Sequence, residues 1–552
     1  MRRSLFGMII ALLAALAVLP VAAHSGSVSV QILAINDFHG NLEPPAGSSG
    51  RVGTINAGGA EYLATHIKQL EATNPNTVVV SAGDLIGASP LLSALFHDEP
   101  TIEAMNQIGL DFNAVGNHEF DEGAAELKRM QNGGCHPTDG CLDGDPFAGA
   151  NFRFLAANVV QAKNRKTLFP AYKIRSFGGV KVAFVGMTLE GTPTIVTPAG
   201  VAGLKFLDEA DTLNKLVREL RENGVKTIVA LIHEGGLPTG GFNECPGISG
   251  PIVDIVNRTS HEVDLFITGH THQAYNCVID GRPVTSALSF GRLVTDITMT
   301  LDRSSGQPTF TSINNLIVTR DVAKDAGVTA LIGKYNAIAA PLANRVIGSI
   351  TADITRVATP AGESSLGDVI ADAQLAATAP ANFGGAVVAF MNPGGIRADL
   401  TFAGSLAGEG DGKVTYGEAF TVQPFGNSLV TKTMTGAQIK AVLEQQFDNP
   451  IAGQNRILQV SAGFSYSWSA SAPTGSKVDP ASIKINSVVV DPAASYRVTM
   501  NSFLATGGDN FSAFNLGTND LGGAVDTDAL EAYFVANSPV APGLRNRITQ
   551  LP

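Results

Sequence analysis

Five apolar, strand-like runs in this chain each end in residues that can bind a metal ion or move a proton. One run, residues 112–115, is followed by Gly116-Asn117-His118-Glu119-Phe120-Asp121. The other four are followed by Asn36-Asp37-Phe38-His39-Gly40, Gly83-Asp84, His233-Glu234-Gly235 and Gly269-His270-Thr271-His272. Because binding sites in α/β sheets are built at the carboxyl ends of the strands, we expect these side chains to come together.

The mixture of imidazole, carboxylate and amide groups is typical of a site for two divalent cations. Two ions about 3.5–4 Å apart need one shared ligand and further ligands on each side, and Asp84 is the best candidate for the shared carboxylate. These ligand types suit zinc or manganese better than calcium, which prefers oxygen alone. Any one motif is more often a polar turn, but five in one chain indicate a metal centre.

Five of the ten histidines lie in these motifs. The others have no such context, and we interpret them as surface or structural residues: His24, His66, His97, His136 and His261.

The runs that carry the motifs alternate with helical patterns, which predicts an α/β domain with buried sheets. Short apolar runs predict strands over residues 28–35, 77–82, 181–188, 227–232 and 264–268. The spacing of apolar residues predicts helices over 60–70 and 208–222. Residues 321–345 are also helical in pattern and could link two domains. A second mixed region follows, with predicted helices at 365–377 and 435–447 and a predicted strand at 386–391.

A length of 552 residues exceeds what one hydrophobic core can organise, so two or more domains are expected. Residues 1–23 have the basic start, apolar run and small-residue end of a signal peptide. A membrane anchor is the alternative, but the apolar run of about 15 residues is shorter than the roughly 20 that span a bilayer. We therefore expect an exported protein without stable membrane insertion.

The charge of the chain argues against one class of partner. Without Arg2 and Arg3 the chain has 35 basic and 49 acidic residues, which gives a net charge near −14. A nucleic-acid polymer is not expected to bind such a protein in general.

Four cysteines are present, and in an exported chain an even number suggests disulfide bonds. Cys135 and Cys141 flank a short loop rich in Gly and Asp, so we pair them, which leaves Cys245 with Cys277. The alternative is free thiols or a metal site, although the spacing fits no zinc motif.

Three glycine-rich segments beyond residue 390 carry groups that suit a nucleotide. Arg397 follows a predicted strand and a Gly-Gly loop, where its guanidinium could hold a phosphate or carboxylate in a bidentate fork. Phe425 lies in a tight turn, and Phe503 precedes a Gly-Gly-Asp segment. Two such rings could sandwich a flat base, although composition alone favours both as core residues.

Together these motifs resemble those of the calcineurin-like metallophosphoesterase superfamily and, more narrowly, of the exported 5′-nucleotidase family. The resemblance covers nearly the whole chain beyond residue 23. It implies an N-terminal α/β domain over 27–325, a four-layer α-β-β-α sandwich, and a C-terminal α+β substrate-binding domain over 346–552. A helical linker or hinge at 326–345 would join them. Because the metal and base sites then lie on different domains, catalysis would require the domains to close on one another.

The resemblance also implies the ligands of each ion. One ion is held by Asp37, His39, Asp84 and His272, and the other by Asp84, Asn117, His233 and His270. Position 272 is Gln or Asn in some members of the family, and His should bind at least as well.

By the same resemblance, His118 is a cation or proton donor toward the substrate. Asp121 would keep the imidazole of His118 oriented and charged, and a pair that only braces the loop is the alternative. Glu119 is interpreted as structural.

The substrate contacts divide between the two ends of a nucleotide. By the resemblance, Phe425 and Phe503 clamp the base, Asn427 and Asp509 approach the nucleoside, and Asn392 and Arg397 approach the phosphate or the ribose. The family often has a further Arg shortly before the segment 362–368. This chain has Arg356 upstream and Pro360 nearer by, so the sequence leaves the role of Arg356 open.

The expected protein is an exported phosphohydrolase that uses two divalent ions, zinc or manganese, to release phosphate from AMP-like 5′-nucleotides. The same groups would serve a 2′,3′-cyclic-nucleotide 2′-phosphodiesterase/3′-nucleotidase or a UDP-sugar pyrophosphatase. A surface binding protein without turnover is the alternative from a different class. The sequence does not determine the native metal, the base preference, the oligomeric state, or whether the location is periplasmic or extracellular.

Overall fold

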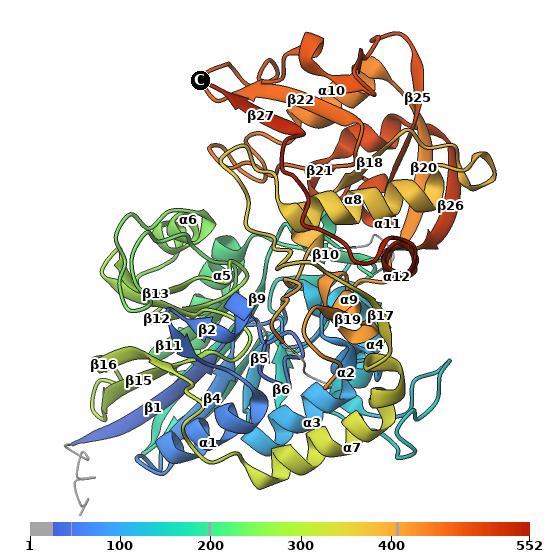
Figure 1. The fold of residues 1–552 in the computed structure, drawn as a ribbon. Coiled ribbons are helices and arrows are strands. Elements are labelled where there is room, and N and C mark those ends of the chain that lie inside the picture. Colours follow the sequence, from blue (N-terminus) through green and yellow to red (C-terminus); the bar gives the residue numbers. More distant parts are fainter. Residues whose placement is uncertain (1–25, 46, 197–199, 405–407) are drawn as a thin grey trace, which may run out of the picture.

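The structure, a computed structural model, describes residues 26–45, 47–196, 200–404 and 408–552. The predicted signal peptide at 1–23 lies outside the described residues. The chain forms an N-terminal domain (blue to yellow in Figure 1) and a C-terminal domain (golden yellow to red) that rests on it. Across the ranges described, no helix is both long and apolar enough to cross a membrane.

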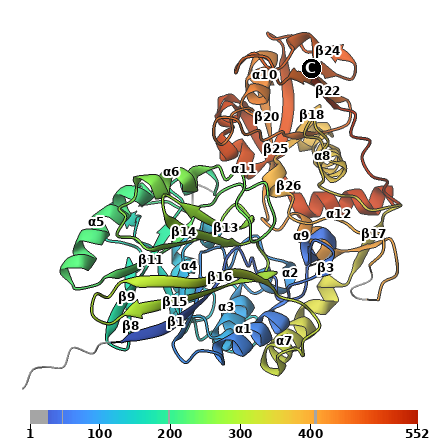
Figure 2. The ribbon, with the colours of Figure 1, turned by 90° about the vertical axis from the view of Figure 1, so that its left-hand side faces the viewer.

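Two six-stranded mixed sheets form the centre of the N-terminal domain (Figure 2). The first has the order β16 (Pro308–Ile317), β15 (Leu293–Asp302), β1 (Ser27–Ile35), β4 (Thr77–Ser81), β5 (Phe112–Ala114) and β6 (Arg153–Leu155). The second has the order β13 (Ala274–Ile279), β14 (Arg282–Ala287), β12 (Leu265–Thr268), β11 (Thr227–His233), β9 (Val180–Thr188) and β8 (Tyr172–Phe177). β1, β4, β5 and β6 pair in parallel, as do β9, β11, β12 and β14.

Three separate apolar clusters place these sheets between two helical layers. Apolar side chains of β1, β4, β9 and β11, such as Val30, Val80, Val182 and Val229, pack between the sheets. Helices α1 (Ala60–Glu71), α3 (Glu99–Ile108), α4 (Gly123–Asn132) and α7 (Ala326–Ala343) cover the other face of the first sheet. Helices α5 (Glu209–Glu222) and α6 (Pro251–Arg258) cover the second. The predicted four-layer α-β-β-α sandwich is therefore confirmed.

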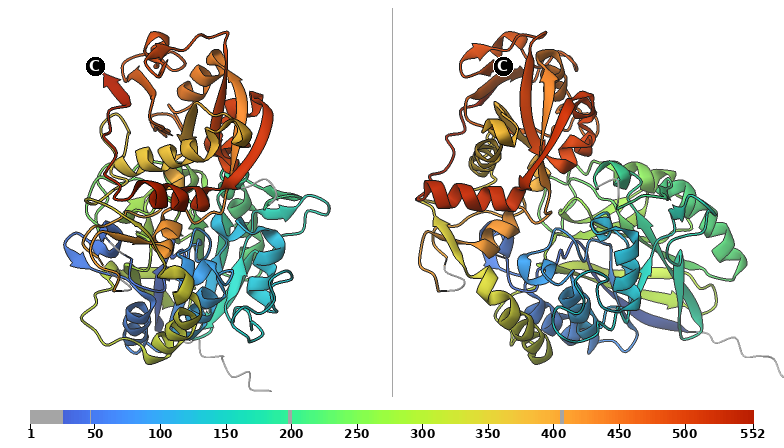
Figure 3. Two further views of the ribbon diagram at one scale, coloured as in Figure 1. Left: turned by 45° about the vertical axis from the view of Figure 1, so that its right-hand side comes forward. Right: turned by 90° about the vertical axis from the view of Figure 1, so that its right-hand side faces the viewer.

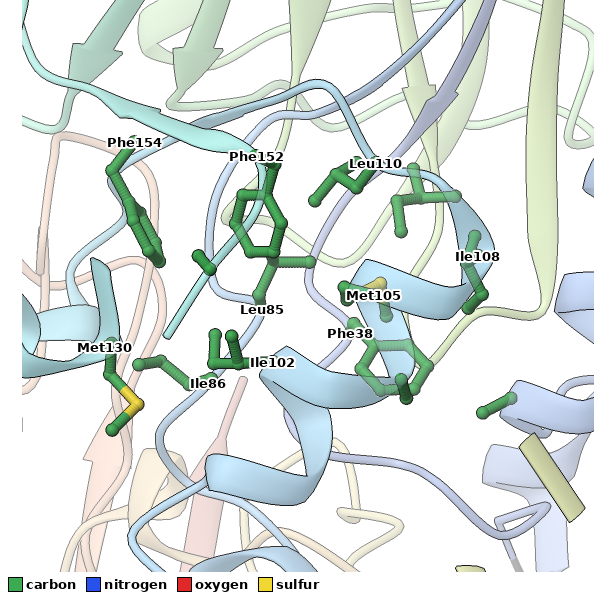
Figure 4. Close-up of a cluster of buried hydrophobic side chains, with 14 of the residues drawn as sticks. Phe38, Leu85, Ile86, Ile102, Met105, Ile108, Leu110, Met130, Phe152 and Phe154 are labelled. Atoms are coloured by element: carbon green, nitrogen blue, oxygen red, sulfur yellow. The ribbon is translucent and has the colours of Figure 1, made fainter. Parts of the chain in front are cut away.

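Local sequence explains where these helices form. In α5 the buried residues Ala210, Leu213, Val217 and Leu220 recur every three or four positions, which gives the helix one apolar face. The side chain of Asp208 caps that helix by accepting from the backbone N–H of Asp211 at 2.7 Å. The core beneath α3 is built in the same way from side chains such as Ile102, Met105 and Ile108, which pack beside Phe38 and Leu85 (Figure 4).

The linker helix α7 belongs to the core of the first domain. Asp325 caps it through the N–H groups of Gly327 and Val328. Its buried residues, including Leu331 and the fully buried Tyr335, lie in the same cluster as α1 and α3. The domain limits and the hinge at 326–345 stay predictions; this packing would confine a hinge to the carboxyl end of α7.

The C-terminal domain is built from a five-stranded sheet with helices against it (Figure 3). The sheet order is β21 (Gln459–Val460), β18 (Val388–Met391), β25 (Ser495–Asn501), β20 (Ser428–Thr435) and β26 (Thr518–Val525). Helices α8 (Ser365–Thr378), α10 (Gly436–Glu444) and α12 (Asp526–Asn537) pack on it. A four-stranded sheet of β24 (Val488–Val489), β23 (Lys484–Ile485), β22 (Phe464–Ser469) and β27 (Ile548–Leu551) and the pair β17 (Val346–Ser349) and β19 (Lys413–Thr415) complete the mixed α+β fold.

Candidate active site

The five sequence motifs meet where the carboxyl ends of the two parallel strand sets converge. β1, β4 and β5 of the first sheet lead into Asp37 and His39, into Asp84, and into Asn117. β11 and β12 of the second sheet end at His233 and just before His270 and His272. All seven residues predicted as metal ligands are thus brought into one place by the ends of these strands.

The first group contains Asp37, His39 and His272, whose ligating atoms all lie within 4.8 Å of one another. His39 Nε2 is 3.1 Å from His272 Nε2, and His272 Nε2 is 3.4 Å from Asp37 Oδ1. His39 Nδ1 donates to the carbonyl of Gly87 at 2.8 Å, so its Nε2 is left as the bare nitrogen that faces the group.

The second group contains Asp84, His233 and His270, again within 4.8 Å, with Asn117 between the imidazoles. Asn117 Oδ1 is 3.1 Å from His233 Nε2 and 3.0 Å from His270 Nδ1. His233 Nδ1 is held by the carbonyl of Ala82 at 2.8 Å. Each imidazole again turns one nitrogen into the group.

Asp84 lies between the two groups. Its Oδ2 is 2.9 Å from His233 Nε2 in the second group and 3.7 Å from His39 Nε2 in the first. A single carboxylate in this position can contact an ion in either group, which is the geometry that a shared ligand requires.

The backbone of these loops adopts the left-handed conformation at several of the predicted metal ligands. Five of the seven residues have left-handed φ: Asp37 (50°), His39 (48°), Asp84 (51°), His270 (68°) and His272 (52°). Such φ values are uncommon outside glycine and cluster at functional sites. Gly83 shows why a glycine precedes Asp84, because a Cβ there would lie 2.6 Å from His233 Nδ1.

The electrostatics of the groups depend on burial. Burial lowers the pKa of His39 and His272, and it lowers that of His270 to about 3, so these rings are neutral donors. Burial also disfavours a charged His233, but the charge and hydrogen bond of Asp84, together with the charges of Asp37 and Glu119, raise the pKa of His233 to about 10. Three neutral imidazoles, the buried carboxylates and His233, which would release its proton when an ion binds, form a donor set that divalent zinc or manganese binds, so the residues present fit two such ions.

Two further buried residues hold these ligands in place. The sequence did not indicate this role for either of them. Asn36 Nδ2 donates to Asp37 Oδ2 at 2.6 Å. Glu119 accepts from the backbone N–H groups of Asp84, Leu85 and Gly116 at 2.6–3.0 Å. Burial, followed by the charge of Asp84, raises the pKa of Glu119 to about 7. Glu119 therefore fixes the loop that presents Asp84.

His118 and Asp121 lie beside the metal groups. His118 Nδ1 is 2.8 Å from Asp121 Oδ2, and the His118 ring is 5.1 Å from that of His39. Burial opposes a charge on His118, yet Asp121 and Asp84 together outweigh burial and raise its pKa. The structure thus places next to the ligands an imidazole whose surroundings favour its charged form, and this imidazole belongs to neither ligand group.

A cavity of about 300 Å³ opens beside these residues and is lined by both domains. The N-terminal domain contributes Asn117, His118, Asp121 and His270. All six residues predicted to contact substrate line the opposite walls: Asn392, Arg397, Phe425, Asn427, Phe503 and Asp509. The volume lies at the lower end of the range of about 300–1,000 Å³ that is typical for small-molecule sites.

Contacts between the domains align the two ends of this cavity. Arg397 Nη2 is 3.5 Å from His39 Nε2, and its guanidinium carbon lies 5.8 Å from the centre of the Phe425 ring. The Phe425 ring in turn stacks on His118 with a centroid separation of 5.7 Å. Arg397 therefore reaches the metal groups beside Phe425, which a separate loop after α9 (Tyr416–Val422) presents.

Asp509 belongs to a polar network in the cavity wall that the C-terminal domain contributes. Asn392 Nδ2 donates to Asp509 Oδ2 at 2.9 Å, and Arg456 forms an ion pair with Asp509. Arg456 also lines the cavity, and no motif in the sequence pointed to it. The Phe503 ring lies against Gly508, where an added Cβ would be only 2.6 Å away.

Arg356, whose role the sequence left open, contacts the N-terminal domain. Arg356 Nη2 donates to Ser49 Oγ of the first domain at 2.7 Å, and the residues that line the cavity do not include it.

Cys135 is bonded to Cys141, with Cα atoms 4.7 Å apart, and Cys245 is bonded to Cys277, with Cα atoms 5.1 Å apart.

Comparisons with known proteins agree with this geometry. Residues 30–274 match the family model of calcineurin-like phosphoesterases, and residues 346–516 match that of the 5′-nucleotidase C-terminal domain. The chain is 33% identical over 533 residues to endonuclease YhcR of Bacillus subtilis, which covers 94% of this chain and 41% of that protein. It is 34% identical over 539 residues to cell wall protein Lmo0130 of Listeria monocytogenes, which covers 92% of this chain and 66% of that protein. The chain thus spans less than two thirds of the length of these two relatives.

A solved structure is similar over both domains at once. The 5′-nucleotidase precursor of Thermus thermophilus superposes with a TM-score of 0.78 at 27% identity, over 95% of this chain and 99% of that one. The two family models together cover both domains in the order seen here. The chain therefore belongs to the 5′-nucleotidase family of calcineurin-like phosphoesterases.

Proposed function

We propose that this chain is an exported phosphohydrolase that uses two divalent cations to release phosphate from AMP-like 5′-nucleotides. The observation that carries the proposal is the shared cavity. One wall holds His118 with Asn117 and His270 of the metal groups, and the other holds two phenylalanines, two arginines and an aspartate. A nucleotide has a phosphate for the first wall and a flat base for the second.

The residues divide the work along the bound nucleotide. Asp37, His39 and His272 would hold one ion and Asn117, His233 and His270 the other, with Asp84 shared. Bound in this way, two divalent ions supply charge that polarises the phosphate and lowers the pKa of water. His118, kept charged and oriented by Asp121, would donate to the phosphoryl oxygens. Arg397 would bind the phosphate or ribose from the opposite domain.

Three features support export. The predicted signal peptide precedes the described chain, and two disulfide bonds are typical of oxidising compartments. One relative at 34% identity is named a cell wall protein. Export is tested by fractionating the producing cells and detecting the chain in each fraction with an antibody. A chain that stays in the cytosol and still contains residues 1–23 would contradict export.

Metal removal tests the reaction. Chelator-stripped protein is expected to lose phosphate release from AMP and to recover it when Mn²⁺ or Zn²⁺ is added, because the ligand groups are otherwise only clustered imidazoles and carboxylates. The measurement is phosphate release from AMP, UDP-glucose and 2′,3′-cyclic AMP in parallel.

The outcomes separate the alternatives. Metal-restored turnover of AMP above the other two substrates supports the 5′-nucleotidase. Turnover of only the cyclic or the pyrophosphate substrate would keep the metal centre and overturn the substrate assignment. An absence of turnover in protein that demonstrably holds metal would favour a binding protein.

The aromatic clamp gives a second prediction. Phe425→Ala and Phe503→Ala are each expected to raise KM for AMP by roughly 5–150-fold, since stacking of one base on an aromatic ring is worth about 1–3 kcal/mol. The measurement is the KM of each variant with AMP and with ribose 5-phosphate, which has no base.

A matched control is Phe383→Ala. Phe383 lies in the same domain, is 56% exposed and is not among the residues that line the cavity. Its KM should match that of the wild type. If ribose 5-phosphate and AMP lost affinity equally in the Phe425 and Phe503 variants, the rings would not be reading the base.

A further inference from the structure

A cluster of histidines and carboxylates lies outside the two metal groups. His97 precedes α3, Glu122 precedes α4, and His136 and Asp139 lie in the loop closed by the Cys135–Cys141 bond. His97 Nδ1 is 2.7 Å from Glu122 Oε2, and His97 Nε2 is 2.9 Å from Asp139 Oδ2. His136 Nδ1 is 3.2 Å from the same Asp139 oxygen. Four side chains from three segments thus meet at one point.

The donor types in this cluster are those of a transition-metal site. The ligating atoms of His97, Glu122 and His136 all lie within 4.8 Å of one another. Two imidazoles with carboxylates suit zinc and similar divalent ions rather than calcium or magnesium, which take oxygen. A comparable group, Glu190, Asp208 and Glu209, contains only carboxylates and has no such selectivity.

Hydrogen bonding alone leaves the charge of the cluster unbalanced. A proton on His97 would lie between Glu122 and Asp139, whose oxygens are 2.7 and 2.9 Å from the two ring nitrogens. One such proton offsets one carboxylate charge, while Glu122 and Asp139 contribute two, since the nearby Glu126 is already paired with Arg129. The rings of His97 and His136 stack at 3.8 Å between centroids, where a second positive ring would be repelled. A divalent cation supplies more charge without that repulsion.

We propose that His97, Glu122 and His136 form a third divalent-metal site, for zinc or an ion of similar chemistry, with Asp139 as an alternative carboxylate ligand. The His97 and His136 side chains are 17% and 16% exposed, which leaves an entry path, while Glu122 and Asp139 are 46% and 45% exposed and free to adjust. The lone pairs of imidazole lie in the ring plane, so binding requires the two stacked rings to turn toward each other. Ligand atoms about 3.3 Å apart, as around a tetrahedral zinc ion, are within reach of such a rotation.

The proposed third metal site lies at the wall of the cavity that contains His118. His97 and Glu122 line the same cavity as His118, and Glu122 directly follows Asp121. An ion there would tie the disulfide-closed loop to the segment that holds Asp121. Metal concentration could then act on the cavity wall from outside the two-ion centre.

A metal count tests the site directly. Chelator-stripped wild-type protein is loaded with Zn²⁺, passed through a desalting column and analysed by plasma mass spectrometry for zinc per chain. His136→Ala, on the exposed disulfide loop, is expected to hold one ion fewer than the wild type. His97→Gln should lose the same ion, so that the result does not depend on one variant.

The control is His261→Ala, because His261 is 74% exposed and pairs with the single carboxylate of Asp280 at 3.2 Å. It should hold as many ions as the wild type. Equal zinc content in the wild type, His136→Ala and His97→Gln would overturn the proposal. The count does not depend on which substrate the two-ion centre hydrolyses, so its failure is distinct from a failure of the proposed function.

Discussion

Asp84→Asn is expected to abolish stable binding of both active-site ions and to lower turnover of AMP by about 10³-fold or more, since single groups that stabilise phosphoryl or oxyanion charge are each worth about 10²–10³. Asp84 faces both groups, at 2.9 Å from His233 Nε2 and 3.7 Å from His39 Nε2. Asparagine keeps the shape of the side chain but loses its charge. The measurement is metal content by plasma mass spectrometry together with phosphate release.

The same substitution at Asp264 provides the control. Asp264 is in the same domain, and burial raises the pKa of its carboxyl to about 7. It directly precedes β12, at the end of that strand opposite to the metal ligands, and accepts a hydrogen bond from the backbone N–H of Ile228. Asp264→Asn should keep the full metal content and most of the turnover. If Asp84→Asn retained both ions, the shared-ligand assignment would be wrong, whatever its rate.

Much of this site was predictable because its ligands follow strands. A buried strand in a layered α/β domain is a short β-branched run, and β1, β4, β9, β11 and β12 each match a predicted run with ends that shift by a single residue. Once the strands are assigned, the residues after them must lie at one edge of a parallel sheet. That two separate sheets bring their ligands to the same place was implied by the resemblance to the 5′-nucleotidase family, and the strand patterns alone do not predict it.

The residues that escaped prediction are those defined by distant partners. Arg456 lies in an irregular segment and gains its role only because Asp509 folds beside it. For Glu119 the sequence predicts a structural role, which agrees with its hydrogen bonds, but not its partners, because they are N–H groups from two different loops. The contact between His97 and His136 was not predicted either, since nothing in the local sequence indicates that a disulfide-closed loop brings the two rings together. Linear spacing carries no information about such pairs.

His118→Ala is expected to lower kcat for AMP by about 10²–10⁴-fold while both active-site ions remain bound. The imidazole is in neither ligand group, yet it lies 5.1 Å from the His39 ring and lines the cavity. Its loss removes a charged donor at the phosphoryl end, whereas the base end still binds, so KM should change little. Steady-state kinetics and metal content, measured on the same preparation, check both parts of this expectation.

Two further variants decide what His118 does. Asp121→Asn keeps a hydrogen-bonding oxygen within reach of His118 Nδ1 but removes the carboxylate that favours the charged ring, so a smaller loss of about 10–100-fold is expected. His66→Ala removes a histidine that hydrogen-bonds to Thr319 in the same domain, and it should leave kcat unchanged. If His118→Ala kept wild-type turnover, the pair would only brace the loop between β5 and α4, and the charge on the phosphoryl oxygens would have to be met by Arg397 and the ions alone.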